Sequence, residues 1–272
     1  MAITMVEISK LRSMTGAGMM DCKNALTESN GDFDKAIEII RKKGQAVAAK
    51  RSDRDASEGC VLAASKDGFA AIIALKCETD FVAKNADFIA LTQSILDVAL
   101  ASKPQNLTEL SALMIDGRSI ADLVTDRSGI TGEKMELDYY EFVEGAAAAA
   151  YVHPGNKLAT VVAFAEAGVD SQVARDVAMQ VAAMNPVSLD RNSVPANIIE
   201  TELEIGREKA RQEGKPENML DKIAQGRLNK FFQESTLLEQ AFIKDNKMSI
   251  ADYLKANKAT ALGFKRVTLN QE

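Results

Sequence analysis

Two carboxylates beside an aromatic residue, Glu78, Asp80 and Phe81, mark one segment of this 272-residue chain. They follow an apolar, strand-like run at 70–75 and precede a helical pattern at 88–100. Carboxylates two residues apart in a strand share a face, so this pair could perform acid–base chemistry. The same junction could instead present Phe81 as a rigid apolar anchor for a partner protein. A third interpretation buries Phe81 in the core, where most Phe side chains lie.

The remaining residues offer little material for catalysis or metal binding. The only histidine is His153, and the three cysteines, Cys22, Cys60 and Cys77, lie far apart in the sequence. A Ser-His-Asp triad or a zinc site therefore has few parts to draw on, and an odd, scattered cysteine count argues against a disulfide framework. We expect the cysteines to be small buried hydrophobic residues, and we expect no bound metal and no cofactor.

Composition and charge indicate a soluble globular protein. Hydrophobic residues make up 46% and charged residues 26% of the chain, proportions found in globular domains. The net charge of −6 disfavours a nucleic-acid partner, because phosphate contacts need a basic surface. No apolar run approaches the roughly 20 residues of a membrane helix, and the start of the chain lacks the pattern of a secretory signal. We therefore expect a cytoplasmic protein with no nucleic-acid or membrane partner.

Residues 1–45 are expected to form a small bundle of three helices. A capping-box pattern that begins at Thr4 starts the first helix, and Asp32 is a suitable N-cap for the third. Gly44 is interpreted as the C-terminal stop of the third helix, so that the charged residues 46–57 become a linker. The apolar positions expected to face inward are Val6, Ile8, Leu11, Met14, Cys22, Ala25, Leu26, Phe33, Ala36, Ile37 and Ile40.

Met19 and Met20 begin the second predicted helix, which runs to Ser29. Two adjacent residues on a helix cannot share one face. If one methionine is buried, the other should point to solvent, where its flexible thioether makes an adaptable contact. Burial of both under the bundle fits the spacing equally well.

A β-hairpin followed by a helix occurs twice in the chain. The first hairpin, residues 58–75, turns at Lys66-Asp67-Gly68, where Asp-Gly is a strong hairpin signal, and a helix to about residue 101 follows. The second has strands at 144–151 and 158–164 around a turn that contains His153, and then a helix at 170–184. The repeat assigns the five alanines at 146–150 to a strand, although alanine favours helices.

The repeat predicts an α+β fold whose core is two related α+β subdomains, each an antiparallel sheet with helices, at 58–139 and 140–272. Between the two units we expect short helices at 107–113 and 120–125, a loop at 129–132 and a strand at 135–143. Residues 195–240 are expected to form an inserted antiparallel helical hairpin, broken at Gly214-Lys215-Pro216. Its apolar stripe is thin, which predicts that it protrudes. A strand at 261–269 should rejoin the second sheet.

Two motifs resemble the elongation factor Ts family. One is Thr15-Gly16-Ala17-Gly18-Met19-Met20-Asp21-Cys22-Lys23-Asn24-Ala25-Leu26, followed by Asn30-Gly31-Asp32, and the other is Thr79-Asp80-Phe81-Val82-Ala83-Lys84. The resemblance extends over essentially the whole chain, including 214–216 and Gly263-Phe264. Two motifs of this length in the same order are very specific. The N-terminal bundle alone also resembles ubiquitin-associated (UBA) domains.

The elongation factor Ts family comprises guanine-nucleotide exchange factors for elongation factor Tu. The resemblance implies that Asp80 and Phe81, with their neighbours Val82 and Ala83, enter the GTPase beside its Mg²⁺ site and loosen GDP. No residue is expected to be catalytic, because exchange involves no covalent chemistry. The resemblance also implies flanking contacts from two further regions. These are Arg12, Met19, Met20 and Lys23 in the bundle, and His153 and Gly155 in a turn that reads His-Gly in some members but carries an inserted Pro154 here.

Two other functions fit parts of the sequence. A UBA-like protein-binding adaptor without exchange activity would act through residues 1–45 and would not need Phe81. A carboxylate enzyme would use Glu78 and Asp80 without help from a histidine or a metal. The second unit favours a functional Phe81, because its matching junction at 165–169 has no aromatic residue. The repeated architecture therefore does not need a Phe there to close its core.

Overall fold

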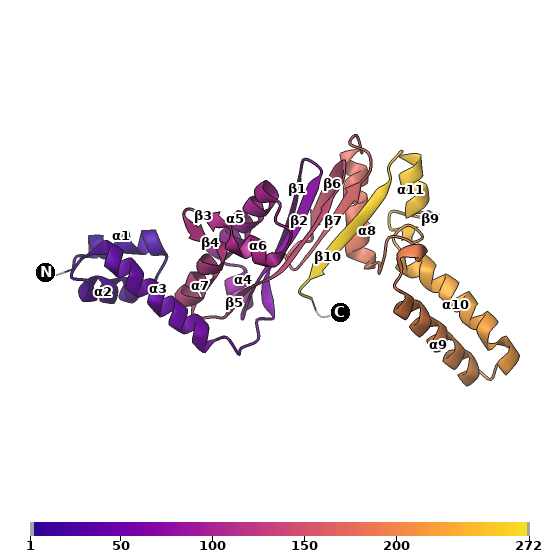
Figure 1. Ribbon diagram of the computed structural model, residues 1–272, viewed down its shortest axis with the longest axis horizontal. Coiled ribbons are helices and arrows are strands. Elements are labelled where there is room, and N and C mark those ends of the chain that lie inside the picture. The colour runs from indigo at the N-terminus through magenta and orange to yellow at the C-terminus, as the bar shows by residue number, and fades with distance from the viewer. Residues whose placement is uncertain (1–2, 271–272) are drawn as a thin grey trace.

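The computed structural model describes residues 3–270. Figure 1 shows an elongated molecule with a helical bundle at the N-terminal end, sheets and helices in the middle, and a helical hairpin that points away at the opposite end. The predicted α+β class is confirmed. No helix among the described residues is both long and apolar enough to cross a membrane.

The N-terminal bundle consists of α1 (Met5–Thr15), α2 (Met19–Glu28) and α3 (Phe33–Lys50). The capping box at Thr4 and the Asp32 N-cap are confirmed. Val6 and Met14 were expected to face inward, and this is wrong: both are exposed, because α1 buries only a narrow stripe. The buried core of the bundle is Ile8, Leu11, Ala17, Cys22, Ala25, Leu26 and Ala36.

The predicted helix stop at Gly44 is wrong. Helix α3 continues to Lys50, and Gly44 is buried inside it. Its backbone lies against Gly129 of α7 (Ile120–Thr131). This contact between distant parts of the sequence outweighs the weak helix propensity of glycine, which is about 1 kcal/mol below that of alanine. The segment without regular structure before the first strand is therefore only 51–57.

The first sheet has the order β1-β2-β5 and is antiparallel. The predicted hairpin is confirmed, with Asp67 and Gly68 at φ 49° and 75° in its turn. The predicted subdomain boundary after residue 139 cuts through β5, which pairs with β2 as far as Glu144. The strands are β1 (Glu58–Lys66), β2 (Phe69–Cys77) and β5 (Met135–Glu144).

Between β2 and β5 the chain forms helices and one small hairpin. The loop predicted at 129–132 is wrong, because α7 continues to Thr131 and ends at Gly132, whose φ is 75°. The predicted helices at 107–113 and 120–125 are confirmed as α6 and the start of α7. The elements are α4 (Asp80–Ala83), α5 (Ala86–Ser102), α6 (Leu107–Ala112), β3 (Met114–Ile115), β4 (Arg118–Ser119) and α7.

The second sheet repeats the topology of the first, in the antiparallel order β10-β7-β6. The alanine run lies in a strand as predicted, and the last strand rejoins this sheet as predicted. Helix α8 covers the sheet. The elements are β6 (Ala147–Val152), β7 (Leu158–Phe164), α8 (Ser171–Met184) and β10 (Ala261–Thr268).

The segment inserted between α8 and β10 includes the predicted helical hairpin, α9 (Ala196–Gln212) and α10 (Leu220–Ser235). Figure 1 shows the hairpin protruding from the body. A small apolar cluster around the buried residues Val194, Leu228 and Phe232 packs its two helices together. The other elements of the insertion are the 3₁₀ turns Arg191–Ser193 and Glu217–Met219, β8 (Ala241–Phe242), β9 (Asp245–Ser249) and α11 (Ile250–Ala256).

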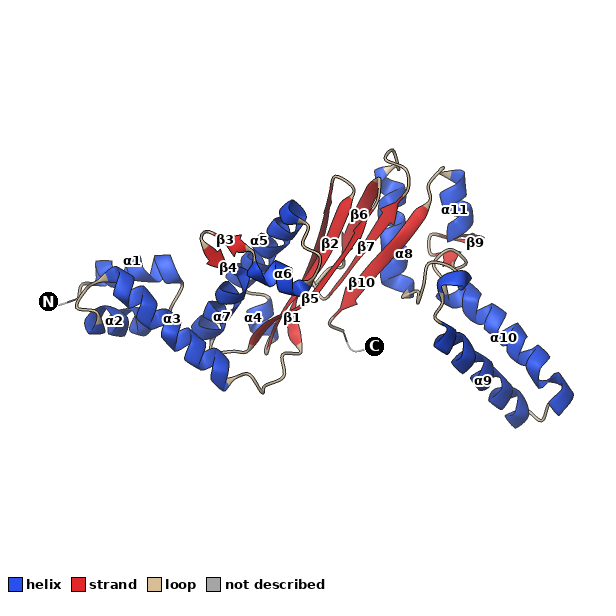
Figure 2. Cartoon of the chain, in the orientation of Figure 1, coloured by secondary structure: helices blue, strands red, loops and turns tan. Residues whose placement is uncertain are grey.

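The two sheets pack face to face, with helices on both outer sides (Figure 2). Alternate residues of β2 serve the two faces: Ile73 and Leu75 pack under α5, and Ile72 and Ala74 pack against β7 of the other sheet. Strands β2 and β7 are consequently buried on both sides. The core is thus a four-layer helix–sheet–sheet–helix body, a rigid support for the loops at its ends.

Candidate partner-binding site

The segment after β2 forms a short helical turn. Thr79 is the N-cap of α4, and its hydroxyl accepts a hydrogen bond from the Val82 N–H at 3.4 Å. Asn85 then caps α5 by accepting from the Asp87 N–H at 2.9 Å. Two caps so close together split the segment into two helices and turn the chain between them. The strand geometry that would place Glu78 and Asp80 on one face is therefore wrong.

Phe81 points to solvent and is 84% exposed. Its neighbours point inward: Ala83 is buried, and Val82 packs against the apolar core between the first sheet and α5. The core interpretation of Phe81 is therefore wrong. Leaving a Phe side chain in water forgoes roughly 1.5–3 kcal/mol of burial, so the fold itself gives no reason for an aromatic residue at this position.

Asp80 lies beside Phe81 and is held by Lys84. The Lys84 Nζ donates to the Asp80 carboxylate at 2.7 Å. This hydrogen bond keeps the pKa of Asp80 below its ordinary value, and the charge of Lys157 acts in the same direction. Asp80 is therefore ionised at neutral pH and lies next to a large apolar surface.

The turn that carries Phe81 is clamped by Glu133, a residue that the sequence analysis did not identify. The carboxylate of Glu133 accepts from the Glu78 N–H at 3.2 Å, from the Thr79 N–H at 3.0 Å and from the Thr79 hydroxyl at 2.6 Å. These residues are more than 50 positions apart in the sequence, so no local pattern could have revealed the contact. The clamp fixes the start of α4 and hence the direction of Phe81.

Glu78 makes the reciprocal contact and is committed to structure. It accepts from the Lys134 N–H at 2.6 Å, and the Arg51 guanidinium donates to both of its oxygens at 3.1 Å. Arg54 adds a longer contact. The hydrogen bond from Lys134 and the two arginines lower the pKa of Glu78. A carboxylate held in this way is poorly suited to acid–base work.

The bundle residues singled out from the sequence are all exposed. Arg12 lies in the last turn of α1, and Met19, Met20 and Lys23 lie on α2. Neither arrangement expected for the two methionines is correct, since Met19 is 46% and Met20 63% exposed. Gly18, the N-cap of α2, starts the helix at the edge of the bundle, where neither side chain reaches the core.

The turn with His153 and Gly155 lies at the same end of the sheets as α4. The Val61 N–H of β1 donates to the Asn156 carbonyl of this turn at 2.7 Å, and Lys157 pairs with Glu58 at 2.7 Å. His153 and Gly155 are exposed. The Nδ1 of His153 lies 3.0 Å from the Tyr151 hydroxyl. The structure therefore brings this turn and the Asp80 segment to one end of the core.

All three cysteines that the structure describes are buried free thiols, as predicted. Burial raises the pKa of Cys60 to about 11 and that of Cys77 to about 12, so neither supplies a thiolate nucleophile at neutral pH. Among residues 3–270, no group of three or more His, Cys, Asp or Glu side chains could hold a metal ion.

Comparison with known proteins defines the class of this chain. Residues 78–271 match the protein family described as Elongation factor TS. A protein named Elongation factor Ts from Porphyromonas gingivalis (strain ATCC 33277) is 64% identical over 275 residues, which cover all of both chains. Proteins of the same name from Azobacteroides pseudotrichonymphae and Amoebophilus asiaticus are 57% and 53% identical, over 100% and 98% of this chain and 100% and 99% of theirs.

These matches place the chain among the elongation factors of protein biosynthesis. The chain belongs to the elongation factor Ts family. The family match begins at Glu78, immediately before the turn that carries Phe81.

Proposed function

We propose that this chain is a guanine-nucleotide exchange factor that binds elongation factor Tu in its GDP-bound and nucleotide-free states. It promotes GDP release by disturbing the groups that hold Mg²⁺ and the phosphates. The observation that carries this proposal is the 84% exposure of Phe81 on a turn clamped by Glu133. A rigid, exposed aromatic beside a charge is suited to fill a pocket of a partner protein.

Exchange requires coupling between two binding events and no covalent step. The factor must bind the nucleotide-free GTPase more tightly than the GDP form, and GDP then weakens the factor by the same amount. A nucleotide with nanomolar affinity has a binding free energy of about −12.3 kcal/mol, and one with micromolar affinity about −8.2 kcal/mol. The factor must therefore supply a difference of about 4 kcal/mol. One aromatic anchor supplies about 2 kcal/mol, so other contacts must contribute the remainder.

The proposed roles follow from the positions of the residues. Phe81 enters the GTPase as an apolar wedge, with Val82 and Ala83 forming its base. The ionised Asp80 competes for the donors and positive charge around the GTPase's Mg²⁺, and the chain binds no ion of its own. Flanking contacts come from Arg12, Met19, Met20 and Lys23 of the bundle and from His153 and Gly155. The process takes place in the cytoplasm, where elongation occurs, without nucleic acid or membrane as a partner.

The direct test is the release of a fluorescent GDP from elongation factor Tu in the presence of Mg²⁺. We expect the chain to accelerate release. When Mg²⁺ is removed with a chelator, the uncatalysed release should rise and the acceleration by the chain should shrink, since its target is already gone. Folded chain that leaves the release rate unchanged with Mg²⁺ present would refute the exchange function.

The exposure of Met19 and Met20 also favours a second candidate function, that of a UBA-like adaptor. An adaptor would bind its partner through the bundle and would not accelerate GDP release. Binding to elongation factor Tu that persists in Phe81→Ala and is abolished by Met20→Ala, without any exchange activity of the wild type, would support this function instead.

A further inference from the structure

Helices α3 and α7 cross with their backbones in contact at two glycines. A Cβ atom added to Gly129 would lie 2.2 Å from the Gly44 Cα and 3.2 Å from the Gly44 nitrogen, which is too close for any side chain. A Cβ added to Gly44 would lie 3.5 Å from the Gly129 Cα, an ordinary van der Waals distance. The crossing therefore requires glycine at position 129 and tolerates alanine at position 44.

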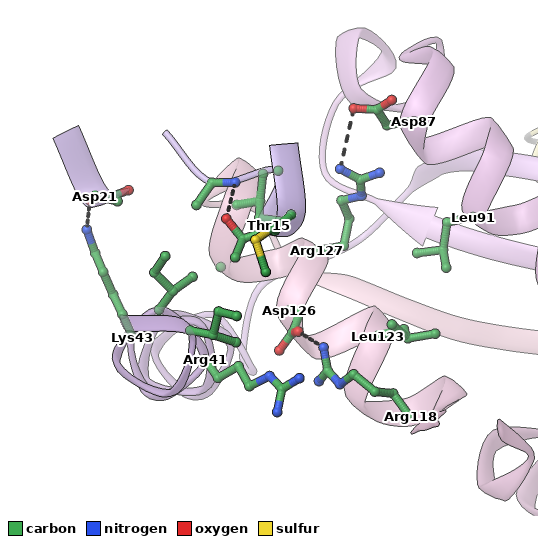
Figure 3. Close-up of a pocket in the computed structure, with 17 residues that line it drawn as sticks. Thr15, Asp21, Arg41, Lys43, Asp87, Leu91, Arg118, Leu123, Asp126 and Arg127 are labelled. Carbon is green, nitrogen blue, oxygen red and sulfur yellow. Dashed lines mark hydrogen bonds and ion pairs between the residues drawn. The ribbon is translucent and has the colours of Figure 1, made fainter. Parts of the chain in front are cut away.

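Little else that is polar holds the bundle against the core. In the described part of the chain, the side-chain hydrogen bonds and ion pairs of residues 3–44 all stay within that range. A cavity of about 410 Å³ lies beside the crossing. Three ion pairs form among the residues that line this cavity (Figure 3), and none of the three joins the bundle to the core. Lys43–Asp21 lies within the bundle, and Arg118–Asp126 and Arg127–Asp87 lie within the core.

Helix α3 also connects the bundle to the turn that carries Phe81. Just past its last residue, Arg51 donates to both oxygens of Glu78 at 3.1 Å. Glu78 is two residues from Asp80 and is fixed by Lys134. Helix α3 thus lies beside α7 (Figure 1), and Arg51, the residue that follows it, contacts Glu78 next to the clamped turn.

We propose that Gly129 is a positioning residue, which sets where the bundle stands relative to Phe81 by allowing α3 to lie directly on α7. This inference rests on the proposed function, because its benefit is that the bundle and Phe81 reach one GTPase together. A two-part grip loses affinity when its parts no longer match the spacing of their sites. The cavity gives the bundle room to shift without repacking the core.

The structure supplies a matched pair of variants. Gly129→Ala and Gly44→Ala each add one methyl group to a helix interior and each gain the same helix propensity. Only Gly129→Ala forces the two backbones apart. A difference between these variants therefore reports the crossing and not the helices.

The first measurement is the distance between spin labels on the bundle and the core. The labels are attached through Asn24→Cys on α2 and Gln93→Cys on α5, because both positions are exposed while the three native cysteines are buried. We expect one narrow distance for the otherwise native chain and for Gly44→Ala, and a shifted or broadened distance for Gly129→Ala. The same distance distribution in all three would overturn the proposal, whether or not the chain has exchange activity.

The second measurement is GDP release as a function of the concentration of the chain. For Gly129→Ala we expect the half-saturating concentration to rise about tenfold and the maximal rate to stay within about twofold, because Phe81 still enters when the site is filled. Gly44→Ala should match the wild type. Equal half-saturation for the two variants would overturn the positioning role, whereas an inactive wild type would overturn only the proposed exchange function.

If Gly129→Ala does not fold, Gly44→Leu tests the same crossing from the other helix. Its side chain presses on the backbone of α7 at Gly129 and Asp126, and it leaves the sequence of the core unchanged. We expect the same shift in label distance and the same rise in half-saturating concentration. An unchanged distance in folded Gly44→Leu would contradict the proposal.

Discussion

The two units of the core share one frame and differ at the junction after their central strand. At each junction a glutamate–threonine contact ties the loop to the segment before the third strand of the sheet. Glu133 of that segment accepts from the backbone and hydroxyl of Thr79 in the first unit, and Glu166 of the junction accepts from those of Thr260 at 2.8 Å each in the second. The first junction then presents Phe81 on α4. The second runs through small residues to the N-cap of α8.

This difference separates architecture from function. The glutamate–threonine contact occurs in both units and serves the frame, because it ties a loop to a neighbouring segment. The exposed aromatic occurs in only one unit, where it forgoes the stabilisation of burial. An exposed aromatic residue that the repeated architecture does not require is the strongest candidate for a contact with another protein.

The largest expected effect is that of Phe81→Ala. The loss of an aromatic anchor worth about 2 kcal/mol should lower the acceleration of GDP release by about 30-fold. The melting temperature should not fall, because the side chain is exposed. Circular dichroism and GDP release measure the two quantities on the same sample.

A phenylalanine introduced in the second junction tests whether exchange depends on the position of the aromatic residue as well as on its type. Adding Ala167→Phe to Phe81→Ala should leave exchange low, since Ala167 lies in a loop of the other unit and not on the clamped turn. The exposed Leu262 provides a control, because Leu262→Ala shortens another exposed apolar side chain and should leave GDP release unchanged. Recovery of exchange by Ala167→Phe would mean that any exposed Phe suffices.

An intermediate effect is expected for Glu133→Gln. Gln offers one acceptor oxygen where Glu133 offers two, so one of the donors at Glu78 and Thr79 loses its partner. We expect the free energy of unfolding to fall by about 1–3 kcal/mol and exchange to fall about tenfold, because Phe81 is no longer held in one direction. Chemical denaturation and GDP release measure these changes.

The matched variant in the second junction is Glu166→Gln. It breaks the same kind of contact, to Thr260, and should lower stability slightly without any change in exchange. If both variants lowered exchange equally, the effect would be general loosening of the core and the two junctions would not differ in function.

The smallest expected effect is that of pH. Hydrogen bonds from Lys84 and from Thr260 hold the pKa values of Asp80 and Glu166 below their ordinary ranges. A lowered pKa in the folded state contributes stability that is present above the unfolded value of about 4 and is lost as pH falls through the folded value. The maximal exchange rate and the melting temperature should therefore show no step from these groups between pH 6 and 8. A step near neutral pH that Asp80→Asn removes would contradict this assignment.

The elements of the fold could be predicted where local residues decide them. Asp67 and Gly68 set a hairpin turn, and the repeat correctly assigned an alanine run to a strand. Predictions failed where distant residues decide, as at Gly44, which stays helical because it lies on Gly129. The clamp by Glu133 could not be predicted for the same reason. The exposure of Phe81 could be inferred from the comparison of the two units, but its direction depends on that clamp.

The central claim is that Phe81, held outside the core, acts on the nucleotide site of another protein. The most direct test is the maximal rate of GDP release from elongation factor Tu at saturating concentrations of wild type and of Phe81→Ala, with Mg²⁺ present. A much lower maximal rate for Phe81→Ala, at an unchanged melting temperature, is the result that this account predicts. Equal maximal rates for the two folded proteins would contradict it.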